Sequence, residues 1–282
     1  MTVLIAGCGD LGTEVGLRFA HAGHRVVGLR RSPGKLPPEI EGWAVDLTRP
    51  LPDLPGDLDV VVVATAADER SEQAYRAAYV DGLRHLLDAL DRQGSQPRLL
   101  LVSSTAVYGV GDGSWVDEAT PAEPASSTGA ILLEAERLLR ARAPRAIILR
   151  AAGIYGPGRT YVIDALLGGT ATIPDPPVSS NRMHRDDVAA AIVHLTTEVE
   201  EPDAVYIGVD DAPVERGEVL RFLADELGVD HPPTAPHQPG MRGAGDKRLR
   251  NDRLKATGFS CAYPTYREGY RAVLAGEGRR HS

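Results

Sequence analysis

The amino-acid sequence predicts an α/β fold in which a doubly wound parallel sheet carries helices on both faces. Two observations favour this class: short apolar runs alternate with helical patterns through the first 150 residues, and several runs are continuously apolar. A continuously apolar run is typical of a strand that is covered on both faces, and such strands alternating with helices are typical of a parallel sheet. The valines between Asp59 and Ala64 are the clearest example.

The expected elements follow one another with short connections. The strands that we expect are 3–6, 25–29, 43–45, 59–64, 98–103, 146–150 and 205–209. The helices that we expect are 13–22, 75–92, 131–141, 186–197 and 215–227. Residues 156–180 are rich in Gly, Pro and Ser and show little periodicity, whereas the Pro/Gly-rich residues 230–245 predict a surface loop.

A glycine motif joins the first expected strand to the first expected helix. Gly7, Gly9 and Gly12 form the spacing G-x-G-x-x-G, with Asp10 and Leu11 before the last glycine. In this context the first glycine permits a tight turn, the second lets a diphosphate approach the backbone, and the third lets helix and strand pack closely. The phosphates then lie on the N–H groups at the helix start. We therefore predict a Rossmann-type dinucleotide-binding fold with these five residues at the cofactor.

The second expected strand ends in Arg30 and Arg31, with no acidic residue before Glu39. A carboxylate at this point accepts a hydrogen bond from the 2′-hydroxyl of NAD, whereas arginine accommodates the 2′-phosphate of NADP. A guanidinium binds phosphate oxygens through a bidentate fork. We predict that NADP is preferred over NAD, with both arginines in the 2′-phosphate pocket. The alternative is that one or both are merely solvated.

Composition and length exclude several classes of protein. The formal net charge is -8 without a Lys/Arg block, which argues against nucleic acid as a partner. No apolar run approaches the roughly 18 residues of a membrane span. The two distant cysteines predict neither a disulfide framework nor a metal site, and the N-terminus does not resemble a signal peptide. We expect a soluble, cytoplasmic protein that acts on a small molecule.

The change in character after residue 155 predicts two parts. Residues 1–155 are expected to form the NADP-binding Rossmann domain. Residues 156–282 are expected to form mostly a smaller C-terminal substrate-side region. The helix at 186–197 and the strand at 205–209 are expected to return to the Rossmann domain.

Several motifs together resemble the extended short-chain dehydrogenase/reductases, the group of NAD(P)-dependent epimerases and dehydratases. The matching segments span nearly the whole chain and are 7–12, 46–47, 64–66, 79–82, 103–109, 153–159 and 181–188. The resemblance implies cofactor contacts at Asp46, Leu47, Ala64, Thr65 and Ala66. It implies that Ser104 is the catalytic hydroxyl. It also implies a homodimer contact through helices 74–90 and 131–141.

The last two matching segments predict contacts with substrate. The candidate substrate-binding residues in them are Tyr155, Arg159, Arg182 and His184. The alternative for the second segment is that its acidic residues, Asp186 and Asp187, only cap and charge-balance the start of a helix.

One motif of this family is missing. Its members carry Tyr-x-x-x-Lys on a helix, where the lysine holds the ribose and lowers the pKa of the tyrosine that acts as general acid or base. This sequence has Thr128 and Leu132 at those positions, and no lysine lies between Leu36 and Asp246. A threonine hydroxyl can donate or relay a proton but is a poor general base without a partner.

Three functions remain open. The first is an NADP-binding oxidoreductase or epimerase/dehydratase-like enzyme that acts on a small carbonyl or sugar-like substrate by an atypical mechanism. Ser104 would then polarise the carbonyl, and Thr128, Tyr108 or Tyr155 would supply the proton. The second is a catalytically silent NADP-binding sensor or scaffold, which the missing pair favours. The third is a non-redox isomerase, hydrolase or lyase on the same fold.

Overall fold

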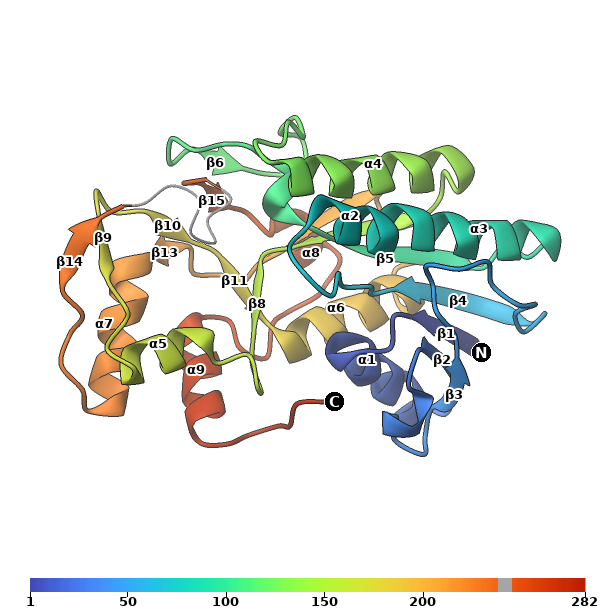
Figure 1. Cartoon of the computed structure of the whole chain (residues 1–282), viewed down its shortest axis with the longest axis horizontal. Coiled ribbons are helices and arrows are strands. Elements are labelled where there is room, and N and C mark those ends of the chain that lie inside the picture. Colours follow the sequence, from blue (N-terminus) through green and yellow to red (C-terminus); the bar gives the residue numbers. More distant parts are fainter. Residues whose placement is uncertain (238–244, 282) are drawn as a thin grey trace.

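The computed structural model, which describes residues 1–237 and 245–281, contains a seven-stranded sheet (Figure 1). Its strand order is β3-β2-β1-β4-β5-β7-β12, and every neighbouring pair is parallel. The strand bounds are Thr2–Ala6 (β1), Arg25–Arg30 (β2), Glu41–Ala44 (β3), Leu58–Val63 (β4), Arg98–Ser104 (β5), Ile147–Ala151 (β7) and Val205–Gly208 (β12). The chain runs outward in both directions from β1 and β4, so the predicted doubly wound α/β fold is confirmed.

Both faces of the sheet are buried, which explains the unbroken apolar runs. In β4, Val60 and Val62 belong to one apolar core and Val61 to another, and all three are at most 2% exposed. Helices α1 (Asp10–His21) and α6 (Arg185–Thr197) cover the first face. The second face is covered by α2 (Glu72–Tyr75), the π-helix η2 (Arg76–Asp81), α3 (Gly82–Arg92) and α4 (Ser127–Arg142).

Helices α1, α2 and α4 each begin three or four residues earlier than the apolar pattern predicts. Helix α1 starts at Asp10 because Gly9 is its N-cap, so the glycine loop runs directly into the helix. Helix α4 starts at Ser127 because the Ser126 hydroxyl accepts a hydrogen bond from the Gly129 N–H. The first turn of α4 consists of polar or small residues, so it lies outside the apolar pattern on which its predicted bounds rested, whereas the first turn of α1 contains the buried Leu11.

The apolar residues of α4 pack inside the chain. Ile131, Leu132, Leu133 and Leu139 are at most 8% exposed. They contact the two cores beside the sheet. The apolar pattern that favoured a dimer contact at 131–141 is therefore explained within one chain, and the homodimer stays a prediction.

A smaller region carries short strand pairs and a third apolar core. The strand pairs are β8 (Gly153–Tyr155) with β11 (Arg182–His184), β9 (Ile173–Asp175) with β14 (Thr234–Pro236), β10 (Ser179–Ser180) with β13 (Val214–Glu215), and β6 (Trp115–Val116) with β15 (Arg248–Leu249). The helices of this region are α5 (Tyr161–Leu167), α7 (Arg216–Leu227) and α9 (Tyr266–Leu274). Helix α8 (Asp252–Ala256) packs against β12, and short 3-10 turns η1 (Pro33–Lys35) and η3 (Thr105–Val107) also lie in the sheet layer.

The two segments expected to lack regular structure differ from that expectation. Residues 156–180 contain α5, β9 and β10, which are too short to give a clear periodicity. In the predicted loop 230–245, residues 234–236 form β14, whereas residues 238–244 lie outside the described residues.

The C-terminal half returns to the sheet layer through α6, β12 and α8. Strand β12 pairs with β7 at one edge of the sheet, and helix α6 packs against α1. After α9 the chain runs back toward the start of α1 (Figure 1). Over residues 1–237 and 245–281, no helix is long and apolar enough to cross a membrane.

Candidate functional site

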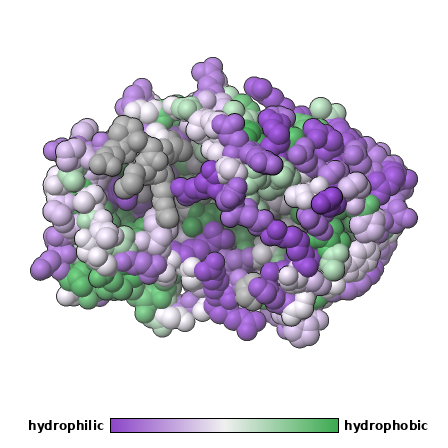
Figure 2. Space-filling view, in the orientation of Figure 1, coloured by the Kyte–Doolittle hydropathy of each residue, from purple (hydrophilic) through white to green (hydrophobic). Residues whose placement is uncertain are grey.

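A cavity of about 600 Å³ opens at the carboxyl ends of the central strands. Figure 2 shows a hollow near the middle of the molecule, bordered by hydrophilic residues. The predicted cofactor residues that line the cavity are Gly7, Gly9, Asp10, Leu11, Arg30, Arg31, Asp46, Leu47, Ala64, Thr65 and Ala66. Ligands of open parallel sheets bind at this edge, where the strand order reverses.

The three glycines of the loop have different constraints. Gly7 has a φ of +88°, and a Cβ there would lie 2.8 Å from the carbonyl carbon of Ala64. A Cβ on Gly12 would lie 2.5 Å from the Gly7 carbonyl oxygen, so Gly12 serves close packing and does not itself line the cavity among the described residues. A Cβ on Gly9 would meet no protein atom within 4 Å. The loop therefore leaves open space at Gly9.

The end of the cavity next to the carboxyl end of β2 is lined by charged side chains. Both terminal nitrogens of Arg31 donate hydrogen bonds to the Asp68 carboxylate at 2.7 Å, and both side chains are about two-thirds exposed. This contact holds the pKa of Asp68 below its usual value. Asp46 accepts hydrogen bonds from the backbone and hydroxyl of Thr48.

Four polar lining residues at this end were not proposed from the sequence. They are Ser32, Lys35, Thr48 and Asp68. Lys35 is one of three lysines in the chain and follows the arginines closely, which is a signal that could have found it. Asp68 has no such signal, because a loop after β4 brings it to Arg31.

The other end of the cavity contains Ser104, at the carboxyl end of β5. The Ser104 oxygen accepts a hydrogen bond from the Ala106 N–H at 3.2 Å, which leaves the hydroxyl hydrogen to be donated. Leu132 lines the cavity at the position where the resembled family carries lysine. This end can therefore donate a hydrogen bond but presents apolar surface in place of an ammonium group.

A buried ion pair lies directly behind Ser104. Arg150 donates hydrogen bonds to the Glu136 carboxylate at 2.6 and 3.1 Å, and the Ser103 hydroxyl donates to the same carboxylate at 2.6 Å. Arg150 also donates to the Tyr108 hydroxyl at 2.6 Å. The four side chains come from β5, the residue that follows η3, α4 and β7, and they fix the end of β5 from behind.

Two of the three predicted catalytic residues lie away from the cavity. Tyr108 is fully buried in an apolar core with its hydroxyl on Arg150, so the structure corrects the expectation that it reaches substrate. Thr128 lies in the first turn of α4, 3.4 Å from the Ser126 hydroxyl, and is not among the described lining residues. Ser104 is the predicted catalytic residue that the structure places in the cavity.

Three predicted substrate residues belong to β8 and β11, and their side chains are buried against α9. Tyr155, Arg182 and His184 are at most 7% exposed, and within the described chain none of them lines the cavity. Burial lowers the pKa of His184 to about 4, so its ring is neutral near pH 7. The nearby Asp210 carboxyl has its pKa raised by burial to about 7. These three side chains face the smaller core, whereas Met183 between them on β11 belongs to the core beside the sheet.

Arg159 differs from these three because it lines the cavity, beside the glycine loop. Its Nε donates a hydrogen bond to Asp10 at 2.8 Å.

In the described part of the chain, no group of three or more His, Cys, Asp or Glu side chains could hold a metal ion.

A family model described as the NAD-dependent epimerase/dehydratase family matches residues 3–208. The chain belongs to this family. Protein YeeZ of Escherichia coli K12 is 32% identical over 202 residues, which cover 68% of this chain and 72% of YeeZ. A Streptomyces 3-diazoavenalumate denitrifying reductase is 27% identical over 95% of this chain and 99% of its own. A solved Methylobacillus flagellatus structure, classed with the same epimerases and dehydratases, is 38% identical over 98% of both chains, with a TM-score of 0.80.

This membership confirms the resemblance to extended short-chain dehydrogenase/reductases and the NAD(P)-binding Rossmann fold. A family defined by NAD dependence and a cavity at the glycine loop together support a nicotinamide dinucleotide as the class of cofactor.

Proposed function

We propose that the protein is an NADP-dependent oxidoreductase or epimerase/dehydratase-like enzyme that acts on a small carbonyl or sugar-like substrate without a Tyr/Lys pair. The observation that carries this proposal is the position of Ser104, whose hydroxyl hydrogen can be donated into a cavity that begins at the glycine loop. A hydrogen-bond donor aimed at a carbonyl oxygen stabilises the charge that develops there.

Three features of the cavity fit a dinucleotide. Gly9 leaves open space beside backbone N–H groups, and the buried Thr65 hydroxyl has no hydrogen-bond partner among the residues that the structure describes. Arg30 and Arg31 end β2 at the cavity wall. When bound, the cofactor supplies a hydride donor or acceptor at its nicotinamide ring.

Each residue then has a defined role. The glycine loop and the start of α1 hold the diphosphate, and the arginines at the end of β2 hold the 2′-phosphate. Ser104 orients and polarises the substrate carbonyl. Leu132 excludes water from the part of the cavity wall at which the family pattern has lysine. The Glu136–Arg150 ion pair keeps the end of β5 in place.

The preference for NADP is tested by titration calorimetry with NADPH and NADH. We expect NADPH to bind more tightly, with its 2′-phosphate replacing Asp68 on Arg31. Arg31→Gln should weaken NADPH binding by about tenfold, the value of a lost charged hydrogen bond, and leave NADH binding unchanged. Asp68→Asn is the matched control and should strengthen NADPH binding. Equal affinity of the wild type for both cofactors would contradict the preference.

The catalytic role of Ser104 is tested by following NADPH oxidation over a panel of small carbonyl compounds and nucleotide sugars. For any substrate found, Ser104→Ala should lower kcat by about 10²–10³-fold, as for loss of one oxyanion donor. Ser104→Thr keeps a hydroxyl and should retain most of the activity. Unchanged turnover by the alanine variant would remove Ser104 from the mechanism.

The position of Leu132 favours a second candidate, an NADP-binding sensor without hydride chemistry. Tight NADPH binding with no oxidation across the panel would establish this function in place of the first.

A further inference from the structure

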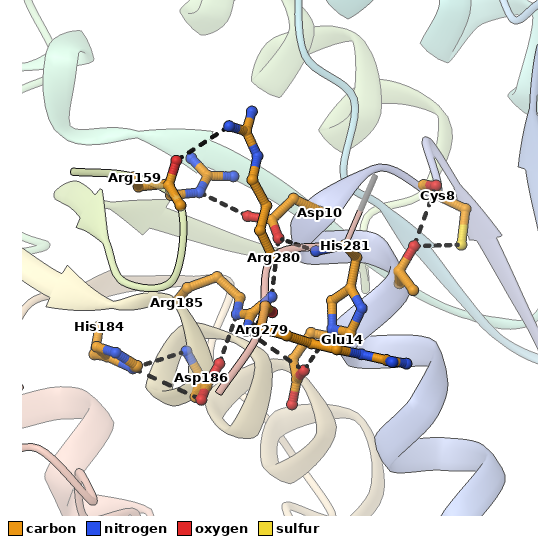
Figure 3. A network of polar contacts seen from close by, with 12 residues as sticks. Cys8, Asp10, Glu14, Arg159, His184, Arg185, Asp186, Arg279, Arg280 and His281 are labelled. Carbon is orange, nitrogen blue, oxygen red and sulfur yellow. Dashed lines mark hydrogen bonds and ion pairs between the residues drawn. The ribbon is translucent and has the colours of Figure 1, made fainter. Parts of the chain in front are cut away.

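Asp10 is the first residue of α1 and lines the cavity beside the glycine loop. Its carboxylate accepts hydrogen bonds from Arg159 Nε at 2.8 Å, Arg185 Nη1 at 2.9 Å and the His281 N–H at 3.1 Å (Figure 3). A carboxylate at this place would repel a diphosphate at the helix start. The two guanidinium groups offset that charge.

Among these donors, Arg159 is the one that lines the cavity in the part of the chain that the structure describes. Its contact with Asp10 uses Nε, and its two terminal nitrogens have no acceptor among residues 1–237 and 245–281. The side chain is one-third exposed, whereas that of Arg185 is 1% exposed. Arg159 is thus fixed at one edge and can present the rest of its planar guanidinium to a phosphate group.

Three consecutive residues near the C-terminus hold this arrangement, and we call residues 279–281 the C-terminal strap. Arg280 packs on Gly158 and donates to its carbonyl at 3.1 Å, so the loop that carries Arg159 is fixed from outside. The Arg279 carbonyl accepts from Arg185 Nη2 at 3.0 Å.

The strap is also anchored on α1. His281 contacts Glu14 through Nε2 at 2.9 Å, and this hydrogen bond is the main cause that lowers the pKa of Glu14 to about 2. The strap therefore connects α1, α6 and the loop before α5 around the carboxylate of Asp10 (Figure 3).

We propose that Arg159 binds the diphosphate of the cofactor together with the glycine loop, and that the C-terminal strap holds Arg159 in position. The inference rests on the proposed function, because it requires a dinucleotide in the cavity. It assigns the loop before α5 to cofactor binding, whereas the sequence placed Arg159 at the substrate.

The test compares two probes by titration calorimetry: NADPH, and adenosine 2′-monophosphate, which lacks a diphosphate. Arg159→Gln should weaken NADPH binding by about tenfold and change the affinity for adenosine 2′-monophosphate by less than about twofold. Arg25→Gln is the matched control, because Arg25 also pairs with an acidic residue, Glu41 at 2.9 Å, away from the cavity and from the strap. It should bind both probes as the wild type does. Thermal melting establishes that each variant is folded, and Arg159→Lys, which keeps the charge, should have intermediate affinity.

Removal of residues 279–282 tests the strap. We expect it to weaken NADPH binding and to add little to the effect of Arg159→Gln, because both act on one contact. Additive effects would overturn the positioning role of the strap. Unchanged NADPH affinity in Arg159→Gln and Arg159→Lys, or equal weakening of both probes, would overturn Arg159 as a diphosphate ligand. A wild-type protein that binds neither NADPH nor NADH would instead overturn the proposed function.

Discussion

Replacing Glu136 with alanine should lower the free energy of unfolding by about 3–5 kcal/mol, because Arg150 would remain buried without its partner. The two side chains are 3% and 8% exposed. The same substitution removes the acceptor of the Ser103 hydroxyl. Urea unfolding followed by circular dichroism measures the change.

An exposed ion pair on the same helix provides the control. Glu134 contacts Arg76 at 2.8 Å, but both side chains are about half exposed. Exposed pairs contribute little, so Glu134→Ala should cost less than about 1 kcal/mol. Equal losses for the two alanine variants would show that the Glu136–Arg150 pair is not a special support of the site. Replacing both partners by Glu136→Leu and Arg150→Met should recover much of the loss, because no charge then remains buried.

Gly9→Ala should abolish most cofactor binding while leaving the fold intact. The new methyl group meets no protein atom within 4 Å and the backbone φ of -85° suits any residue, so stability should change by less than about 1 kcal/mol. The methyl group would occupy the space in which a diphosphate approaches the loop. Overpacking of this kind should make the free energy of NADPH binding less favourable by about 1–3 kcal/mol, which is a roughly 5–150-fold loss of affinity. Titration calorimetry measures this loss.

Gly56→Ala is the matched control for this substitution. A Cβ there also meets no protein atom within 4 Å, and the residue does not line the cavity described above. Its NADPH affinity should equal that of the wild type. Gly7 is a poorer test, because its φ of +88° and its contact with Ala64 would destabilise the fold as well. Normal NADPH binding by Gly9→Ala would contradict the placement of the diphosphate.

The sheet and the cofactor residues could be predicted from the sequence because their signals are local. Buried parallel strands appear in the sequence as continuous apolar runs, and the glycine loop must lie between a strand and a helix. The start of α4 was missed because Ser126 acts through capping, which an apolar pattern does not record.

The substrate side was harder to predict because side-chain direction in a short strand depends on register. The family pattern places Tyr155, Arg182 and His184 on β8 and β11, yet the pairing of these strands turns the three side chains into the protein. The contact between Asp10 and His281 joins residues 271 positions apart, and no motif signals it.

The return of the chain to its first loop has a consequence for biosynthesis. The glycine loop is synthesised well before His281, which contacts Asp10 and Glu14 from 271 and 267 positions further along the chain. A nascent chain can form β1 and α1 long before it can complete the surroundings of Asp10. We therefore expect tight cofactor capture only after residues 279–281 have been made, so a nascent chain that stops before them should bind NADPH weakly.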